Sequence, residues 1–233
     1  LTAVPTIEYM ELDNVSFRHE EKVILSHANY RFEAGRKYLI LGENGSGKST
    51  LINLIPRFYD VTEGRVLVDG VDVREMTQKE VRSRLGYVPQ KGVLFSGTID
   101  SNIRYGKTDI SETEVKEAAE VAQATEFIDA KPEQYASPIA QGGTNVSGGQ
   151  KQRLSIARAI AKKPEIFIFD DSFSALDFKT DSTLRKALKE HTKDATTIIV
   201  AQRISTILNA DKIIVLDDGH MAGIGTHGEL MKN

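Results

Sequence analysis

Short runs of β-branched and aromatic residues recur along the chain and predict buried strands. Several of these runs are almost continuously apolar, which is typical of strands that are covered on both faces. Patterns with helical spacing alternate with them, so the sequence predicts an α/β fold with a largely parallel central sheet. The predicted strands are Lys37–Leu41, Arg65–Val68, Ile166–Phe169, Thr197–Val200 and Lys212–Leu216.

Two Asp-Gly pairs lie between strand-like runs and predict tight hairpin turns. They are Asp69-Gly70 and Asp218-Gly219. Asp-Gly favours the two-residue turns that join antiparallel strands. An antiparallel β part is therefore expected beside the parallel sheet.

The middle of the chain, Lys91–Lys162, has a mainly helical pattern. Ser111 followed by Glu114 has the spacing of a capping box at the start of a helix. Apolar residues at helical spacing follow it: Val115, Ala118, Ala119 and Ala122. We interpret this stretch as a helical lobe inserted into the α/β body, with its apolar positions used for packing.

Composition narrows the class of protein. The chain has 233 residues, of which 40% are hydrophobic, and a net charge of −3, so it can fill a core and has no basic excess for nucleic acid. It has no cysteine, which excludes disulfides and thiolate metal sites. No apolar run approaches the roughly 18 residues that cross a bilayer, and the first residues do not resemble a signal peptide. We expect this polypeptide to be soluble by itself.

The sequence GENGSGKST has the spacing of a phosphate-binding loop, between a predicted strand and a predicted helix. Its glycines let the backbone curl so that successive amides point at phosphate oxygens. Lys48 is expected to reach the β- and γ-phosphates of ATP, and the Ser49 hydroxyl to bind Mg²⁺. The candidate ATP-binding residues are Gly42, Glu43, Asn44, Gly45, Ser46, Gly47, Lys48, Ser49 and Thr50.

A second chemical signal is EIFIFDD, residues 165–171. A hydrophobic strand that ends in a carboxylate places Asp170 at the carboxyl edge of the sheet, beside the phosphate loop. There Asp170 can hold magnesium as a Walker-B aspartate does. An Asp-Asp pair alone is weak, but together with the loop it predicts a phosphate-loop NTPase.

The sequence NVSGGQKQRL, residues 145–154, resembles the signature of ATP-binding cassette (ABC) proteins. Its candidate residues are Ser147, Gly148, Gly149 and Gln150. A hydroxyl and bare amides at a helix start can bind an anion, so the chain has two half-sites for phosphate. Two half-sites in one chain imply head-to-tail pairing, in which each signature closes over the other domain's ATP.

The resemblance extends over nearly the whole chain. It implies a phosphate-loop (RecA-like) core at 1–90 and 163–233 with a β subdomain, and a helical subdomain at 91–162. Gln90 looks like the Q-loop glutamine that ligates Mg²⁺, and Asp177 looks like the aspartate of the D-loop at the dimer interface. The stretches LFSGTIDSNI and IGTHGEL are similar to those of exporters. The resemblance therefore implies a transmembrane domain N-terminal to this one, and a place at the cytoplasmic face of a membrane.

Two catalytic positions depart from the family pattern. Asp171 stands where the family has a catalytic glutamate, and an aspartate is one methylene too short for the usual reach of a general base. Gln202 stands where the family has a histidine; it can donate a hydrogen bond to the γ-phosphate but cannot carry a proton. His19 takes the place of the aromatic residue that stacks on adenine. It either touches the base or is a solvated loop residue.

The joint departure of Asp171 and Gln202 resembles the degenerate subunit of heterodimeric exporters. Such a subunit binds ATP, hydrolyses it poorly and lends its signature to a partner with intact catalytic residues. The alternative is a homodimer in which Asp171 supports slow turnover.

Two other classes of function stay open at this point. A soluble ABC ATPase acting on nucleic acid or ribosomes is one, although the chain lacks the coiled coils and second cassette that such relatives carry. A nearly inert regulatory module that binds ATP is the other. The transported substrate cannot be named from this domain.

Overall fold

The computed structural model describes residues 6–201 and 210–232. Gln202 therefore lies outside the described residues. The described chain divides into two compact units. The first comprises 6–85, 165–170, 194–201 and 210–232, and the second comprises 86–164 and 171–193.

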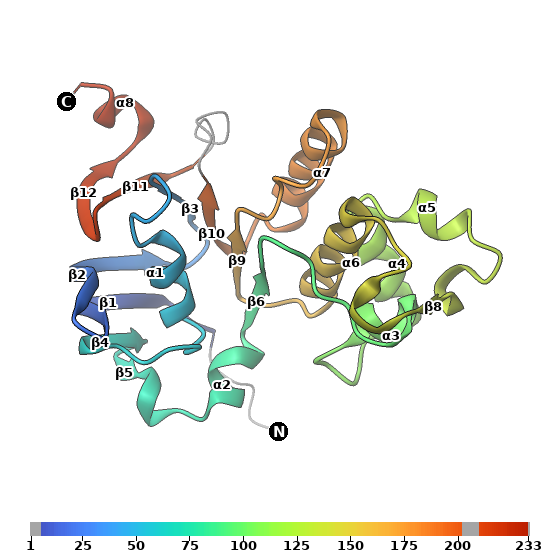
Figure 1. Cartoon of the computed structure of the whole chain (residues 1–233), viewed down its shortest axis with the longest axis horizontal. Helices are drawn as coiled ribbons and strands as arrows, with labels where there is room; N and C mark the ends of the chain where they lie inside the picture. The colour runs from blue at the N-terminus through green and yellow to red at the C-terminus, as the bar shows by residue number, and fades with distance from the viewer. Residues whose placement is uncertain (1–5, 202–209, 233) are drawn as a thin grey trace. The chain divides into compact units, whose positions relative to one another are not determined.

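A mostly parallel sheet has the strand order β12-β11-β3-β10-β9-β6; its first five strands belong to the first unit, and β6 begins there at Leu85 and continues into the second (Figure 1). Strand β10 pairs in parallel with β3 and with β9, and β11 pairs in parallel with β3. The hairpin partner β12 is antiparallel to its neighbour β11. The bounds are β3 Lys37–Leu41, β6 Leu85–Val88, β9 Ile166–Asp170, β10 Thr196–Ala201, β11 Lys212–Asp217 and β12 His220–Gly225.

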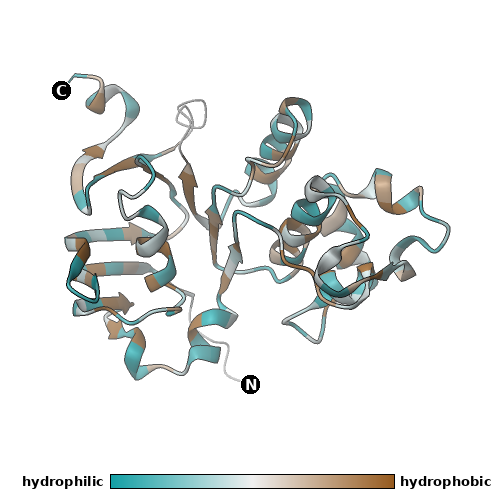
Figure 2. Cartoon of the chain, viewed as in Figure 1, coloured by the Kyte–Doolittle hydropathy of each residue, from teal (hydrophilic) through white to brown (hydrophobic). Residues whose placement is uncertain are grey.

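The strands of this sheet form because their side chains are buried. Residues 166–169 of β9 are all at most 3% exposed, and Figure 2 shows β9 and β10 as predominantly hydrophobic. A run of this kind has no polar face to present to water, which makes it a covered strand. The predicted α/β class is confirmed, and so are the predicted strands at these positions.

A second, antiparallel sheet in the same unit has the order β2-β1-β4-β5. Its strands are β1 Tyr9–His19, β2 Lys22–Glu33, β4 Glu63–Val68 and β5 Val71–Asp72. Both predicted Asp-Gly turns are present: Asp69 and Gly70 have φ values of 49° and 82°, and Asp218 and Gly219 have 46° and 79°. Two successive positive φ values are the mark of a type I′ turn.

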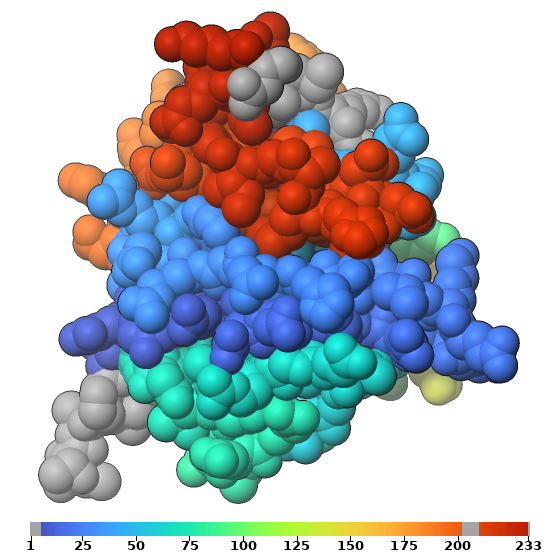
Figure 3. Space-filling model, turned by 90° about the vertical axis from the view of Figure 1, so that its left-hand side faces the viewer, coloured from blue at the N-terminus to red at the C-terminus, as the bar shows by residue number. Residues whose placement is uncertain are grey.

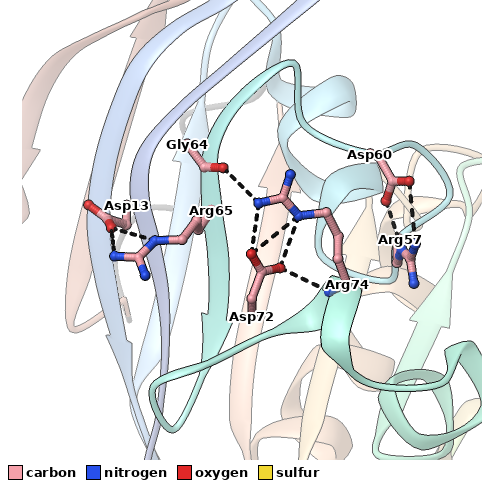
Figure 4. Close-up of polar contacts among 7 residues, drawn as sticks. All are labelled: Asp13, Arg57, Asp60, Gly64, Arg65, Asp72 and Arg74. Atoms are coloured by element: carbon pink, nitrogen blue, oxygen red, sulfur yellow. Dashed lines mark hydrogen bonds and ion pairs between the residues drawn. The ribbon is translucent and has the colours of Figure 1, made fainter.

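Ion pairs line the antiparallel sheet and the segment that follows α1 (Lys48–Leu54) (Figure 4). Arg65 and Asp13 pair across β4 and β1 at 2.6 Å, and Arg74 pairs with Asp72 at 2.7 Å. Arg74 also donates to the Gly64 carbonyl. Because the Arg65 and Asp13 side chains are largely exposed, their pair contributes little to stability.

The second unit is mainly helical. Its helices are α3 Ile99–Arg104, α4 Glu112–Val121, α5 Thr125–Asp129, α6 Gly148–Ala161 and α7 Phe178–His191. A short antiparallel pair, β7 (Gly97–Thr98) and β8 (Pro138–Ile139), accompanies them. The predicted capping box of Ser111 and Glu114 is present at the start of α4. The finer division into subdomains at 91–162 stays a prediction.

The remaining short helices are α2 Gln78–Ser83 and α8 His227–Leu230, with 3₁₀ turns at Val73–Glu75, Gln134–Ala136 and Gln141–Gly143. Within the described residues, no helix has both the length and the apolar character needed to span a bilayer.

Candidate nucleotide-binding site

The loop that connects β3 to α1 has the backbone of a phosphate-binding loop. Gly45 and Gly47 adopt φ values of 84° and 98°, in the left-handed region that favours glycine. The Ser46 amide donates to the Glu43 carbonyl at 3.1 Å, which closes a turn before α1 begins. A side chain on Gly42 could not fit, because its Cβ would lie 2.4 Å from Ser46 Oγ and 2.8 Å from the Leu216 carbonyl.

Lys48 is 6% exposed, although it is a cation. Its Nζ donates to the Glu43 carbonyl at 3.4 Å, so the side chain folds back along the loop. A buried ammonium is stable only with compensating polar partners. The Ser46 hydroxyl is also buried, and it makes no hydrogen bond within the described part of the chain. A buried cation and an orphaned hydroxyl at a glycine-rich turn fit the phosphate groups of ATP.

Strand register brings the phosphate loop and Asp170 to the same edge of the sheet. Leu41 pairs with Ala201, and Asp170 pairs with Val200, so β3 and β9 end within one residue of each other on either side of β10. Parallel strands present their carboxyl ends together, where α/β proteins bind ligands. Asp170 is half-buried at this edge.

The oxygen ligands at this edge fit a magnesium ion better than a metal held by the protein alone. Ser49 and Asp170 offer a hydroxyl and a carboxylate, the hard donors that Mg²⁺ prefers. Among the described residues, no group of three or more His, Cys, Asp or Glu side chains could hold a metal. Mg²⁺ usually takes one or two protein oxygens and completes its shell with phosphates and water.

In the second unit, Gln90 and Asp171 form a direct contact. Gln90 Nε2 donates a hydrogen bond to Asp171 Oδ2 at 3.3 Å. Asp171 has a φ of 46°, a conformation that aspartate tolerates better than most residues. The two side chains belong to segments 81 positions apart, so this pair could not be predicted from the sequence.

Gln152 is a functional candidate that sequence reasoning missed. It is 1% exposed, and its side-chain amide donates to the carbonyls of Pro89 and Ser172 at 3.0 and 2.7 Å. Pro89 precedes Gln90, and Ser172 follows Asp171, so one side chain of α6 holds both loops. A polar residue at a buried position of an amphipathic helix was the signal that could have revealed it.

The signature residues begin α6. Ser147 is its N-cap: Ser147 Oγ accepts from the Gln150 amide at 3.1 Å, and Gln150 Oε1 accepts from the Ser147 amide at 3.3 Å. A capping hydroxyl accepts one hydrogen bond and keeps its own hydrogen for donation. A Cβ on Gly148 would meet no atom within 4 Å, and one on Gly149 would meet only the Ala175 carbonyl. The start of α6 is therefore open to an approaching group.

Asp177 is the N-cap of α7. It accepts hydrogen bonds from the Thr180 amide at 2.9 Å and from the Thr180 hydroxyl at 2.8 Å. These bonds lower the pKa of its carboxyl, the backbone bond having the larger effect. The next residue, Phe178, has a large apolar side chain that is 90% exposed.

His19 ends β1 and pairs with Lys22 across the turn to β2. Its side chain is exposed, while the nearby Phe17 ring packs against Tyr59 at 5.7 Å. The structure thus brings together the loop 42–50 with Asp170 in one unit, and Gln90 with Asp171 in the other. It leaves the predicted contact of His19 with adenine as a prediction.

The glycine-rich loop after β3, with Asp170 at the same carboxyl edge of the sheet, defines the class of phosphate-loop nucleotide-binding domains. Residues 25–174, more than half of the chain, match the family model described as ABC transporter. The chain belongs to the ABC transporter family.

Curated relatives carry the name "Putative multidrug export ATP-binding/permease protein". One from Staphylococcus aureus is 45% identical over 95% of this chain, and YgaD from Bacillus subtilis is 46% identical over 95%. A solved structure of a bacterial Atm1-family ABC exporter with ATP bound superposes with a TM-score of 0.93 at 40% identity over 99% of this chain. The chain spans about two-fifths of the length of these proteins, 39% of both curated relatives and 40% of the solved chain.

Proposed function

We propose that this chain is the energy-coupling ATP-binding domain of an ABC exporter. The loop 42–50 holds the phosphates of ATP, with the buried Lys48 as the observation that carries the assignment. Ser49, Gln90 and Asp170 hold magnesium, which when bound neutralises phosphate charge. Export is supported by the names of the relatives, and their greater length supports a transmembrane domain in the same protein at the cytoplasmic face of a membrane.

The domain pairs head-to-tail with a second nucleotide-binding domain. The open, capped start of α6 supports this pairing, because Ser147 has a hydrogen to donate there and Gly148 has no side chain. A helix start with bare amides attracts phosphate oxygens. The signature Ser147–Gln150 then completes the nucleotide site of the partner, and Asp177 lies at the interface with it.

The domain's own site hydrolyses ATP poorly. Asp171 carries the shorter carboxylate, and the contact with Gln90 at 3.3 Å supports a carboxylate engaged inside its own unit. A general base must come within hydrogen-bond reach of the attacking water. Gln202, by its residue type, adds no proton acceptor. The partner is a half-transporter with intact catalytic residues, and His19 lies at the adenine.

Calorimetry and a phosphate-release assay on the purified chain test this function. We expect the chain to bind Mg-ATP, the Lys48→Ala variant to lose binding, and turnover to be weak. Absence of binding by the unaltered chain would refute the nucleotide site. Brisk turnover that rises with the square of the chain concentration would instead indicate a homodimer that uses Asp171.

A further inference from the structure

The C-terminal hairpin reaches the phosphate loop through one backbone hydrogen bond. The Gly219 amide, at the tip of the β11–β12 turn, donates to the Ser46 carbonyl at 2.9 Å. The space-filling view shows the C-terminal segment directly against the N-terminal strands on this face of the first unit (Figure 3). We propose that Gly219 is a positioning residue for the phosphate loop, an inference that rests on the proposed nucleotide site.

The bond fixes the orientation of the peptide that joins Ser46 to Gly47. The described peptides include no cis bond, and in a planar trans peptide the C=O and N–H groups point to opposite sides. Because Gly219 holds the Ser46 carbonyl, the Gly47 N–H points away from the hairpin. Gly47 is the N-cap of α1, at the end of the loop that is proposed to hold phosphate. Without the bond, this peptide can rotate, and the Gly47 N–H then no longer points toward the proposed phosphate site.

Strand β2 holds Gly219 in place from the other side. The Ser26 amide donates to the Gly219 carbonyl at 2.9 Å. A Cβ on Gly219 would lie 2.4 Å from the Ile24 carbonyl, and a Cβ on Gly47 would lie 2.9 Å from the same atom. The two glycines therefore share one tight contact with β2, which explains why both must lack a side chain.

The chain offers a matched control in its other type I′ turn. Gly70 has a φ of 82°, close to the 79° of Gly219, but a Cβ there would meet only the Tyr9 hydroxyl at 3.4 Å. Gly70→Ala and Gly219→Ala thus carry the same conformational strain, and only the second disturbs the loop. A third variant replaces Gly219 by glycolate, which exchanges the N–H for an ester oxygen and adds no side chain.

The experiment measures Mg-ATP affinity by calorimetry and the free energy of unfolding by urea for all three variants. We expect about tenfold weaker binding for the glycolate chain, the factor that corresponds to about one hydrogen bond, and weaker binding still for Gly219→Ala. Gly70→Ala should lose stability and keep its affinity.

Unchanged affinity in the glycolate chain would overturn the positioning role while leaving the nucleotide site intact. Equal affinity losses in Gly70→Ala and Gly219→Ala would overturn it too, because general instability would then explain both. Failure of the unaltered chain to bind Mg-ATP would refute the proposed function itself.

Discussion

The side-chain amide of Gln152 lies 2.7 Å from the carbonyl oxygen of Ser172 and donates a hydrogen bond to it, across 20 positions of sequence. The same amide donates to the Pro89 carbonyl, and the Ser172 hydroxyl in turn donates to the Val88 carbonyl at 2.6 Å. The helix that begins with the signature is therefore bonded to the two segments that present Gln90 and Asp171. Gln152 of α6 and the backbones of the segments that carry Gln90 and Asp171 belong to one hydrogen-bonded network.

Gln152→Leu should lower the free energy of unfolding by about 2–4 kcal/mol, since two buried carbonyls lose their donor. Gln78→Leu is the control, because Gln78 is exposed on α2, and it should change stability by less than about 0.5 kcal/mol. Urea unfolding followed by circular dichroism measures both. Equal effects of the two substitutions would contradict the bridging role.

Asp171→Glu combined with Gln202→His should raise ATP hydrolysis in the assembled transporter by about a hundredfold, the lower range for a correctly placed general base. Glutamate at a φ of 46° is also strained, so we expect a stability loss of about 1 kcal/mol. Phosphate release measures the first effect and thermal unfolding the second. An unchanged rate would show that another element limits the chemistry.

Ser147→Ala and Ser111→Ala remove equivalent caps from α6 and α4. Each should destabilise the chain by about 1 kcal/mol, the usual value of such a cap. Only Ser147→Ala should also slow hydrolysis at the partner's site, because only that hydroxyl is proposed to contact the partner's ATP. Paired assays of stability and turnover distinguish the two. If Ser111→Ala slows turnover equally, the loss reflects folding alone.

Glu114 supplies a pH-dependent contribution to stability. Its ion pair with Lys163 at 2.8 Å, followed by its bonds to Ser111, lowers the pKa of the carboxyl from 4.5 to about 2. Because the pKa is lower in the folded chain, the ionised carboxylate stabilises the fold at pH values above its unfolded pKa of 4.5. This contribution to stability is lost as the pH falls from 4.5 towards 2. Glu114→Gln keeps the cap but removes the titration. The stability difference between the two proteins should be constant near neutrality and vanish near pH 2, and a constant difference throughout would contradict the pairing.

Arg158 of α6 allows a test of how much a mostly buried cation contributes to the free energy of unfolding. Its guanidinium donates to the Val93 and Asn102 carbonyls at 2.7 and 2.8 Å, and burial lowers its pKa to about 10, so it stays charged at neutral pH. Arg158→Leu should cost about 2–4 kcal/mol in urea unfolding. Arg31→Leu, which removes an exposed cation over the Tyr9 ring, should cost less than about 1 kcal/mol. A loss of unfolding free energy in Arg158→Leu as small as that in Arg31→Leu would contradict this prediction.

Local chemistry explains which elements could be predicted. Strands β3, β9, β10 and β11 are mostly apolar, and the Asp-Gly turns have a conformation that those residues favour, so these elements were visible in the sequence. Strands β1, β2 and β6 were not predicted from the sequence. In β1 the alternation of buried residues breaks at Asn14, where φ is 50° and the register shifts between Leu12 and Val15. A bulge of this kind hides a strand from any test of period two.

The candidate site also has parts that could be predicted from the sequence and parts that could not. The loop 42–50 and the start of α6 are contiguous sequences, so their geometry follows from their own glycines and caps. The bonds from Gln152, Gln90 and Gly219 join segments far apart along the chain. Such contacts depend on packing that no single stretch of sequence specifies.

Strand β10 stands between the strand that leads into the phosphate loop and the strand that ends in Asp170. Neighbouring strands lie about 4.8 Å apart, so β10 sets a distance of roughly 10 Å between β3, which leads into the phosphate loop, and β9, which ends in Asp170. That width accommodates a hydrated cation and the tail of a triphosphate. Strand β10 thus sets the spacing of the site and supplies no reactive group. Ile198 and Val200 are exchangeable for other aliphatic residues of similar volume. Deleting one residue from β10 would instead misalign both the phosphate loop and the Asp170 carboxylate.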